Sequence, residues 1–288
     1  MIEPALNPES GFRRLRIDLA YDGTNFAGWA KQPDLRTVQG ALEEALAKLV
    51  RVPINTIVAG RTDAGVHATG QVVHVDIPES APSSRYRPAE DIWDFAHFKY
   101  RLNQMLDEDI RVLEVDNAPV NFDARFSATA RHYRYKLLDG NRDLPPLRRI
   151  DVATWFRPLD VALMNQASAP LLGKHDFFTF CRYREGSTTE RTLLEFQWSR
   201  DPEGFLICDI AADGFGWNMV RNLVGASVCV GEGRFPVTWI SEILGAGERV
   251  SDSYVFPARG LTLVTVDYPD AAALADFEYA GSSPDASF

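Results

Sequence analysis

The stretch that decides the fold runs from Ile57 to His74 and reads Ile-Val-Ala-Gly-Arg-Thr-Asp-Ala-Gly-Val-His-Ala-Thr-Gly-Gln-Val-Val-His. Its apolar start, residues 57–59, predicts a β-strand, and residues 72–77 predict an antiparallel partner strand. Between them lies a polar loop that carries Arg61 and Asp63. An ordinary hairpin loop with a local ion pair would explain this pattern, and so would a loop that performs chemistry.

Three glycines bracket the loop: Gly60, Gly65 and Gly70. Glycine adopts positive φ without strain and lets another molecule approach closely, so we expect tight turns here. The stretch also holds His67 and His74, and histidine is a common metal ligand. A third ligand at a suitable spacing is missing from the sequence, so we interpret both as loop and strand residues and expect no metal site.

Outside this stretch, the apolar periodicity predicts the order β-α-β-β-α-β twice. The first half has expected strands at 14–21, 57–59, 72–77 and 110–115, and expected helices at 37–51 and 90–106. The second half has expected strands at 132–138, 191–198, 205–210 and 261–266, and expected helices at 160–172, 217–230 and 236–244. Two split β-α-β halves give an α+β fold. We expect an N-terminal half over residues 1–118, a C-terminal half over 119–269 and a disordered acidic tail over 270–288.

The composition is that of an ordinary globular protein, with 45% hydrophobic and 24% charged residues. No apolar run approaches the roughly 18–20 residues of a membrane span, and the N-terminus lacks a basic and apolar signal region. The three cysteines are too few and too scattered for a disulfide framework or a zinc site. We therefore expect a cytoplasmic protein without a membrane anchor.

The net charge of −10 argues against a nucleic-acid partner, because phosphates attract lysine and arginine. Residues 125–157, however, contain eight basic residues against three acidic ones, which predicts one basic surface on a polarised molecule. Only five of the thirty basic residues are lysine. An acidic composition with arginine in place of lysine suggests a halophilic source.

Several motifs together resemble the TruA family of tRNA pseudouridine synthases. The longest is Gly-Arg-Thr-Asp-Ala-Gly-Val-His at residues 60–67, followed by Gly-Gln-Val-Val-His at 70–74. Similar stretches lie at residues 21–24, with Phe26, Gly28 and Trp29, and at 122–128, 131–135, 173–177 and 219–225. Two departures occur: the connection 78–94 is longer than in compact bacterial members, and Phe-Gly-Trp-Asn at 215–218 replaces a histidine-bearing sequence. The second departure suggests an archaeal member of the family.

The resemblance implies the pseudouridine synthase fold, in which two ferredoxin- or RRM-like halves join their antiparallel sheets and hold the active site in the cleft between them. It implies an isomerase, a tRNA pseudouridine(38-40) synthase, that converts uridine to pseudouridine at positions 38, 39 and 40 of the anticodon stem-loop. It also implies a homodimer that binds tRNA. The reaction detaches the base from C1′ and rejoins it through C5. Nothing is oxidised, so we expect no cofactor.

The resemblance also assigns roles to four residues. Asp63 is the expected nucleophile, attacking either C1′ or C6, between which the sequence does not decide. Arg61 is expected to occupy the space of the extruded base and to pair with phosphate or with Asp63. Tyr133 is expected to pack against the target base, and its hydroxyl to help remove the proton at C5. Arg221 is expected to pair with the catalytic aspartate. Without the resemblance, Arg61 would be a surface ion pair and Tyr133 a core residue.

Two other classes of protein fit parts of the pattern. A non-catalytic RNA-binding module often uses split β-α-β sheets, but it would show aromatic residues on its central strands and would not need Asp63. A glycosidase usually needs two carboxylates that flank the scissile bond, and this loop offers only Asp63.

Overall fold

The computed structural model describes residues 8–9, 11–79, 94–182, 188–247 and 254–275. The chain divides into two compact units. The N-terminal unit comprises Ile2–Thr129 and Thr265–Gly281, and the C-terminal unit is built chiefly from Ala130–Val264.

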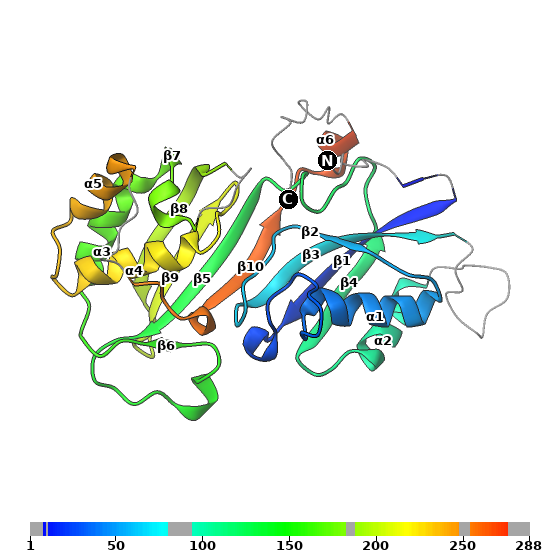
Figure 1. Cartoon of the computed structure of the whole chain (residues 1–288), viewed down its shortest axis with the longest axis horizontal. Helices are drawn as coiled ribbons and strands as arrows, with labels where there is room; N and C mark the ends of the chain where they lie inside the picture. Colours follow the sequence, from blue (N-terminus) through cyan, green and yellow to red (C-terminus); the bar gives the residue numbers. More distant parts are fainter. Residues whose placement is uncertain (1–7, 10, 80–93, 183–187, 248–253, 276–288) are drawn as a thin grey trace. The chain divides into compact units, whose positions relative to one another are not determined.

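The N-terminal unit contains the predicted β-α-β-β-α-β order. Its elements are β1 (Phe12–Tyr21), α1 (Val38–Val50), β2 (Thr56–Val58), β3 (His67–Pro78), α2 (Phe95–Met105), β4 (Ile110–Asn117) and the short α6 (Ala271–Ala275). The strands follow the order β4-β1-β3, with β2 also paired to β3 (Figure 1). These pairs are antiparallel, and Val58 lies opposite Val73. The hairpin predicted from residues 57–77 is therefore confirmed.

The C-terminal unit repeats this arrangement and adds two short strands. Its elements are β5 (Ala130–Leu138), β6 (Ala153–Thr154), α3 (Val161–Ser168), β7 (Gly173–Asp176), β8 (Glu190–Arg200), β9 (Leu206–Ala212), α4 (Met219–Gly231), α5 (Trp239–Ala246) and β10 (Leu261–Asp267), whose last three residues belong to the N-terminal unit. The strands follow the order β10-β5-β9-β8-β7, and β6 runs parallel to β5. In both units the first strand lies between the third and the fourth. The predicted α+β class is confirmed.

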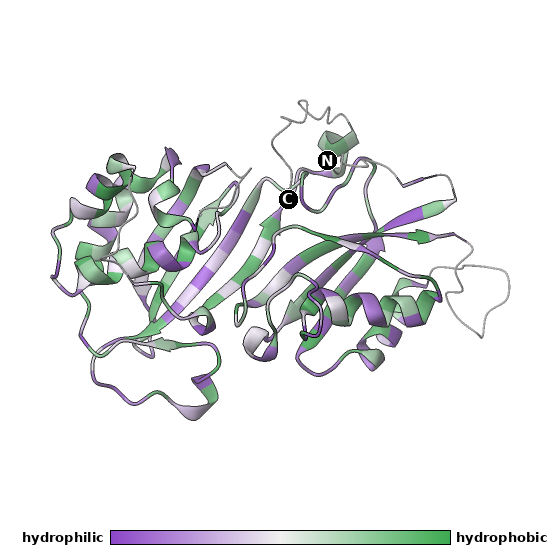
Figure 2. Ribbon diagram, viewed as in Figure 1, coloured by the Kyte–Doolittle hydropathy of each residue, from purple (hydrophilic) through white to green (hydrophobic). Residues whose placement is uncertain are grey.

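Helix α1 shows how local sequence sets an element. The N–H of Gly40 donates to the side chain of Thr37 at 3.2 Å, which caps the first turn, and Arg51 closes the last turn in the left-handed conformation at φ 63°. The apolar face expected from the sequence is buried: Leu42, Ala45, Leu46 and Leu49. Figure 2 shows the resulting mixture of hydrophobic and hydrophilic residues along the helices and strands.

Helix α4 is the most buried helix of the C-terminal unit. The apolar stripe expected from the sequence, Met219, Leu223, Ala226 and Val230, lies in the core.

In the described part of the chain, no helix combines the length and the apolar character that crossing a membrane requires.

The division between the units falls after Thr129, eleven residues beyond the expected boundary at 118. Contacts of the segment 119–129 explain this position. The guanidinium of Arg14 donates to the carbonyl of Phe122 at 2.9 Å, and the N–H of Ala124 donates to Nδ1 of His74 at 2.9 Å. The hydroxyl of Tyr268 donates to the carbonyl of Ala124 at 2.7 Å, so residues after β10 also pack on the N-terminal unit.

The expected tail differs from the structure at its start. Residues 271–275, which we expected to be disordered, form α6, and the carbonyls of Leu274 and Ala275 accept bonds from the side chain of Asn121, both at 3.3 Å. The rest of the expected tail, residues 276–288, lies outside the described residues, as do residues 80–93 of the long connection.

Candidate active site

The loop that carries Arg61 and Asp63 connects β2 to β3 in the N-terminal unit. Its backbone is bonded on both sides of the aspartate: the N–H of Trp29 donates to the carbonyl of Thr62 at 3.0 Å, and the N–H of Val66 donates to the carbonyl of Asp63 at 3.1 Å. Thr62 is buried, Asp63 is partly exposed and Arg61 is exposed. The loop therefore has a hydrogen-bonded backbone, with the guanidinium of Arg61 exposed and the carboxylate of Asp63 partly exposed.

A buried polar network lies behind this loop. The hydroxyls of Tyr21 and Thr62 are 2.8 Å apart, and Nε2 of Gln71 donates to the Tyr21 hydroxyl at 3.2 Å. The same amide nitrogen donates to the carbonyl of Gly60 at 2.9 Å, and Oε1 of Gln71 accepts from the N–H of Val72 at 3.2 Å. Burial raises the pKa of Tyr21 to about 12, so its hydroxyl keeps its proton at neutral pH.

Glycines allow this packing, although only one of the three expected ones adopts a special conformation. Gly65 has φ +77°, whereas Gly60 and Gly70 are not among the residues with positive φ. Gly28 has φ +99°, and a Cβ there would lie 3.0 Å from the carbonyl oxygen of Thr62. Gly28 is thus needed for close approach of two backbones, a role that the sequence motif did not reveal.

The two histidines of the stretch accept hydrogen bonds from backbone amides. The N–H of Gly23 donates to Nδ1 of His67 at 3.0 Å, and the N–H of Ala124 donates to Nδ1 of His74 at 2.9 Å. Burial lowers the pKa of His74 to about 4, with the nearby carboxylate of Asp123 opposing the shift. Across the described ranges, no three His, Cys, Asp or Glu side chains are grouped in a way that could hold a metal ion.

Tyr133 and Arg221 belong to the C-terminal unit. Tyr133 lies on β5, is 8% exposed, and meets the ring of Phe215 edge-on at a centroid distance of 5.2 Å. Arg221 lies on α4, where its Nε donates to the carbonyl of Phe256 at 2.6 Å and its Nη1 donates to Oδ1 of Asn218 at 3.2 Å. Both side chains are therefore oriented by their neighbours within this unit.

The segment 215–218 has a structural role that the sequence did not predict. Beside Phe215, which contacts Tyr133, it contains Trp217, which is 43% exposed. The guanidinium of Arg182 lies over the Trp217 ring at 4.1 Å, and the N–H of Arg182 donates to the Trp217 carbonyl at 2.8 Å. The segment thus joins the strand of Tyr133 to the start of the helix of Arg221.

The four predicted site residues fall into two pairs, one in each unit. Arg61 and Asp63 share the β2–β3 loop, separated by Thr62. On the other unit, the strand of Tyr133 and the helix of Arg221 both bond to residues 256–257, since the Tyr135 hydroxyl donates to the carbonyl of Pro257 at 2.8 Å. The pairing of Arg221 with Asp63 stays a prediction.

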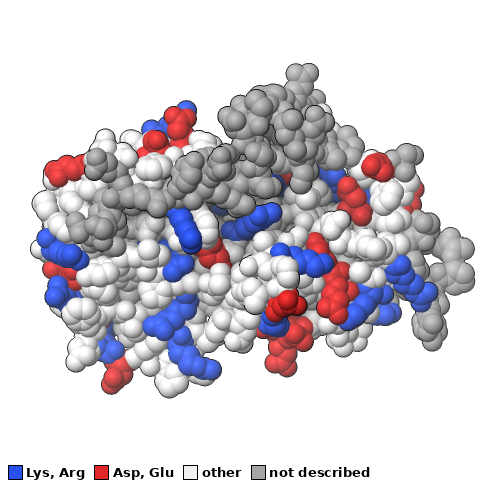
Figure 3. Space-filling view, in the orientation of Figure 1, with Lys and Arg blue, Asp and Glu red and all other residues white. Residues whose placement is uncertain are grey.

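The basic segment 125–157 is less basic in the structure than its residue count indicates. Its ion pairs include Arg134 with Asp209 at 2.7 Å, Lys136 with Asp151 at 3.1 Å, Arg142 with Asp139 at 3.1 Å, Arg148 with Asp151 at 3.2 Å and Arg157 with Glu232 at 3.4 Å. Two of these acids, Asp209 and Glu232, come from other parts of the chain. Figure 3 shows blue and red groups side by side at several places on the visible face. Contact of this segment with RNA stays a prediction.

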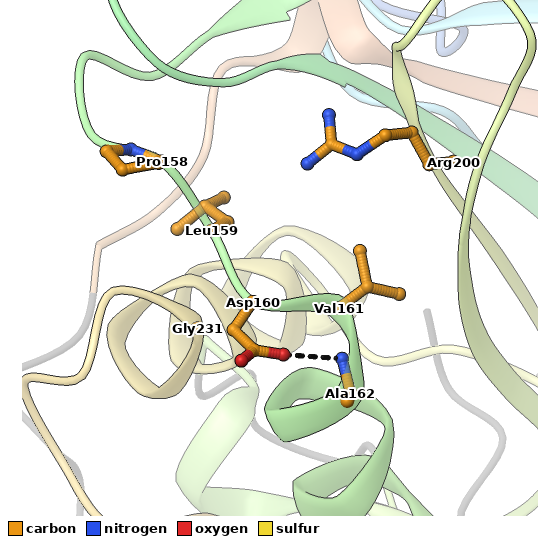
Figure 4. A pocket seen from close by; sticks show the side chains of 7 residues that line it. All are labelled: Pro158, Leu159, Asp160, Val161, Ala162, Arg200 and Gly231. Atoms are coloured by element: carbon orange, nitrogen blue, oxygen red, sulfur yellow. Dashed lines mark hydrogen bonds between the residues drawn. The ribbon is translucent and has the colours of Figure 1, made fainter.

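A surface hollow lies at the start of α3, lined by Pro158, Leu159, Asp160, Val161, Ala162, Arg200 and Gly231 (Figure 4). Its polar groups have partners within the protein. Asp160 accepts from the N–H of Ala162 at 2.8 Å, and Arg200 bonds to Asp139 at 2.8 and 2.9 Å. None of the four predicted site residues lines it.

The chain matches the family model described as tRNA pseudouridine synthase over residues 19–127 and 167–269. The chain belongs to the tRNA pseudouridine synthase family. Enzymes of this family are isomerases that convert uridine in tRNA to pseudouridine, and this is the activity of the chain. The matched ranges contain Arg61, Asp63 and Arg221 but not Tyr133, which lies between them.

Three relatives named tRNA pseudouridine synthase A show how extensive the similarity is. The protein from Frankia casuarinae is 50% identical over 92% of this chain and 93% of its own length. Those from Mycobacterium leprae and Corynebacterium glutamicum are 49% and 47% identical, with 91% and 90% of this chain covered and 92% and 90% of their own lengths. These sources are bacteria, so the expectation of an archaeal member was wrong. It rested on the four residues 215–218, too short a segment to indicate a lineage.

Proposed function

We propose that this enzyme isomerises uridines at positions 38, 39 and 40 of the tRNA anticodon stem-loop, with the carboxylate of Asp63 as the nucleophile. The position of Asp63 carries the proposal: it is a partly exposed carboxylate on a loop whose backbone is bonded at Thr62 and at Asp63 itself. The similarity to relatives named tRNA pseudouridine synthase A supports the substrate. A nucleophile held in this way reacts without first having to be ordered.

The reaction is an internal rearrangement of one nucleotide. The N1–C1′ bond breaks, a C5–C1′ bond forms, C5 loses a proton and N1 gains one, so the atoms balance without an oxidant or a leaving group. Asp63 can form a temporary bond either to C1′ of the ribose or to C6 of the base, and it is released when the new C–C bond is complete. A metal or a cofactor is not required by this chemistry.

The other three residues have proposed roles around the reacting base. Arg61 is exposed beside Asp63, and its planar guanidinium suits the space of a base that has left the stem. Tyr133 would pack on the target base, with its hydroxyl near C5. Arg221 would pair with the Asp63 carboxylate and keep it ionised.

We further propose that the enzyme works in the cytoplasm as a homodimer in which both subunits hold one tRNA. This assembly follows from the family resemblance. Light scattering at micromolar concentration should give a mass near twice 32.2 kDa. A monomer that persists when tRNA is added would contradict the dimer and leave the chemistry of Asp63 unaffected.

The decisive test of the proposed chemistry is Asp63→Asn, which keeps the shape of the side chain and removes its charge and nucleophilicity. Turnover of an unmodified tRNA transcript should fall by at least about three orders of magnitude. The affinity for tRNA should stay within roughly tenfold, because phosphate contacts dominate binding. Pseudouridine is mapped by position in the product, and a melting curve reports folding. Turnover near that of the wild type would refute Asp63 as the nucleophile, and pseudouridine outside positions 38–40 would refute the substrate assignment.

A further inference from the structure

The buried network behind the catalytic loop has one fixed donor, the side-chain amide of Gln71. An amide nitrogen can only donate, so the Tyr21 hydroxyl accepts from Nε2 of Gln71 at 3.2 Å. The same hydroxyl forms a second hydrogen bond, to Oγ1 of Thr62 at 2.8 Å, in which either oxygen can be the donor. The opposite orientation of the Gln71 amide would place its oxygen against the carbonyl of Gly60, 2.9 Å from Nε2 at present, and is excluded for that reason.

Burial makes this network rigid. Tyr21 is 4% exposed, Thr62 6% and Gln71 0%. Each polar atom that lost its partner here would remain without water to replace it, which destabilises the arrangement that lacks the bond. The two loop positions that the network holds, Gly60 and Thr62, lie on either side of Arg61, and Thr62 directly precedes Asp63.

We propose that Tyr21 and Gln71 are positioning residues of the reaction: acting through Thr62 and Gly60, they fix the loop so that the Asp63 carboxylate is presented in the reactive geometry. The proposal rests on the proposed role of Asp63. It goes further by identifying two residues, from β1 and β3, that touch neither the substrate nor the reacting atoms. Displacement of a reacting group by about 1 Å can lower a rate by about a hundredfold.

The main test replaces Tyr21 by Phe, which removes only the hydroxyl. The turnover number kcat should fall about 10- to 100-fold, while KM and the Kd for tRNA stay within about threefold. The matched control is Tyr268→Phe, which loses a bond of similar kind, from the hydroxyl to the carbonyl of Ala124 at 2.7 Å, in the same unit but away from the loop. This control should keep the kcat of the wild type even though its melting temperature also falls.

A second pair of variants tests the network at its other end. Thr62→Val keeps the shape of the side chain and removes the hydroxyl, so it should lower kcat as Tyr21→Phe does. Thr62→Ser keeps the hydroxyl and should restore kcat. Because Tyr21→Phe and Thr62→Val break the same bond, the double variant should be no slower than the slower single variant. This pair also decides the matter if Tyr21→Phe does not fold.

The outcomes distinguish this inference from the proposed function. An active Asp63→Asn enzyme would overturn the role of Asp63. An inactive Asp63→Asn enzyme together with wild-type kcat in Tyr21→Phe or in Thr62→Val would overturn positioning alone. A fall in kcat that Tyr268→Phe reproduces would overturn it as well, because loss of a tyrosine hydroxyl away from the loop would then have the same effect.

Discussion

The two units repeat one arrangement of strands but differ in the connection between the second and third strands of each repeat. In the C-terminal unit this connection, between β8 and β9, is a turn that closes its own hydrogen bonds. The N–H of Asp201 donates to the carbonyl of Phe205 at 2.9 Å, and the N–H of Phe205 donates to Oδ1 of Asp201 at 2.8 Å. In the N-terminal unit the connection is the longer loop with Arg61 and Asp63, which depends on Trp29 and Gln71 for its support.

The side chains packed behind the two connections also differ, being apolar behind the β8–β9 turn and partly polar behind the β2–β3 loop. Behind the β8–β9 turn lies an apolar cluster of Leu138, Val152, Phe205 and Ile207. Behind the β2–β3 loop, Tyr21 at the end of β1 and Gln71 on β3 bring polar groups into the core. The tight turn closes two hydrogen bonds of its own, and its Gly204 carbonyl accepts from Arg142 at 2.7 Å. A longer loop has unpaired backbone groups, and buried polar side chains can satisfy these and hold them in place.

The largest difference between the two connections should appear when the same substitution is made in both. Asp63→Asn is expected to abolish turnover, as argued above. Asp201→Asn removes the same charge from the C-terminal turn, and its amide oxygen can still accept from the N–H of Phe205. Turnover of Asp201→Asn should therefore stay within about twofold of the wild type, measured in the same assay. Equal losses in both variants would mean that the two connections do not differ in function.

The next largest effect should be on stability in the C-terminal unit. Arg142 donates to the carboxylate of Asp139 at 3.1 Å and to the carbonyl of Gly204 at 2.7 Å, and Asp139 is 5% exposed. Arg142→Glu should lower the free energy of unfolding by about 2 kcal/mol, because it removes charge-assisted bonds that are partly exposed to solvent and sets two carboxylates together.

Arg149→Glu is the matched control for this reversal. Arg149 is exposed and donates to the carbonyl of Pro146 at 3.0 Å, so its reversal should change stability by less than about 0.5 kcal/mol. Urea unfolding measures both variants. If the segment 125–157 faces RNA, both should weaken tRNA binding and reduce its dependence on salt. An unchanged Kd in Arg149→Glu would remove this segment from the RNA surface, and equal stabilities would contradict the ion-pair argument.

A loss of stability of comparable size should occur at low pH, because of a buried histidine in the N-terminal unit. Burial lowers the pKa of His74 to about 4, whereas an unfolded histidine has a pKa near 6.5. Between these values the unfolded state binds more protons, so stability rises with pH through this window and is lost as pH falls from about 6.5 towards 4. At pH 5 the loss should be about 2 kcal/mol relative to pH 7.

Unfolding of the wild type and of His74→Asn at several pH values measures this contribution. The amide oxygen of the asparagine can still accept from the N–H of Ala124, but the smaller side chain leaves part of the buried ring site unfilled, so the variant should be less stable at pH 7, and its stability should depend less on pH in this window. Parallel pH profiles of the two proteins would assign the acid sensitivity to other groups.

The sequence by itself determined the main elements of this fold and indicated a candidate reactive group. Apolar residues alternate with polar ones in the strands and recur at helical spacing in α1 and α4, because one side of each element is buried. Such a pattern can be recognised within a few consecutive residues. The hairpin of β2 and β3 and the candidate nucleophile Asp63 followed from one continuous stretch. The short strands β6 and β7 lacked such a pattern and were not predicted.

Only the tertiary structure decided which polar groups meet. Gln71 bonds to Tyr21 fifty positions away, and Arg134 pairs with Asp209 seventy-five positions away, so neither the loop support nor the partial neutralisation of the basic segment could be found from local sequence. The contacts of Ala124 likewise place the segment 119–129 with the N-terminal unit. The physical reason is that a buried polar group must be paired, but its partner is chosen by the register of strands that the chain brings together only on folding.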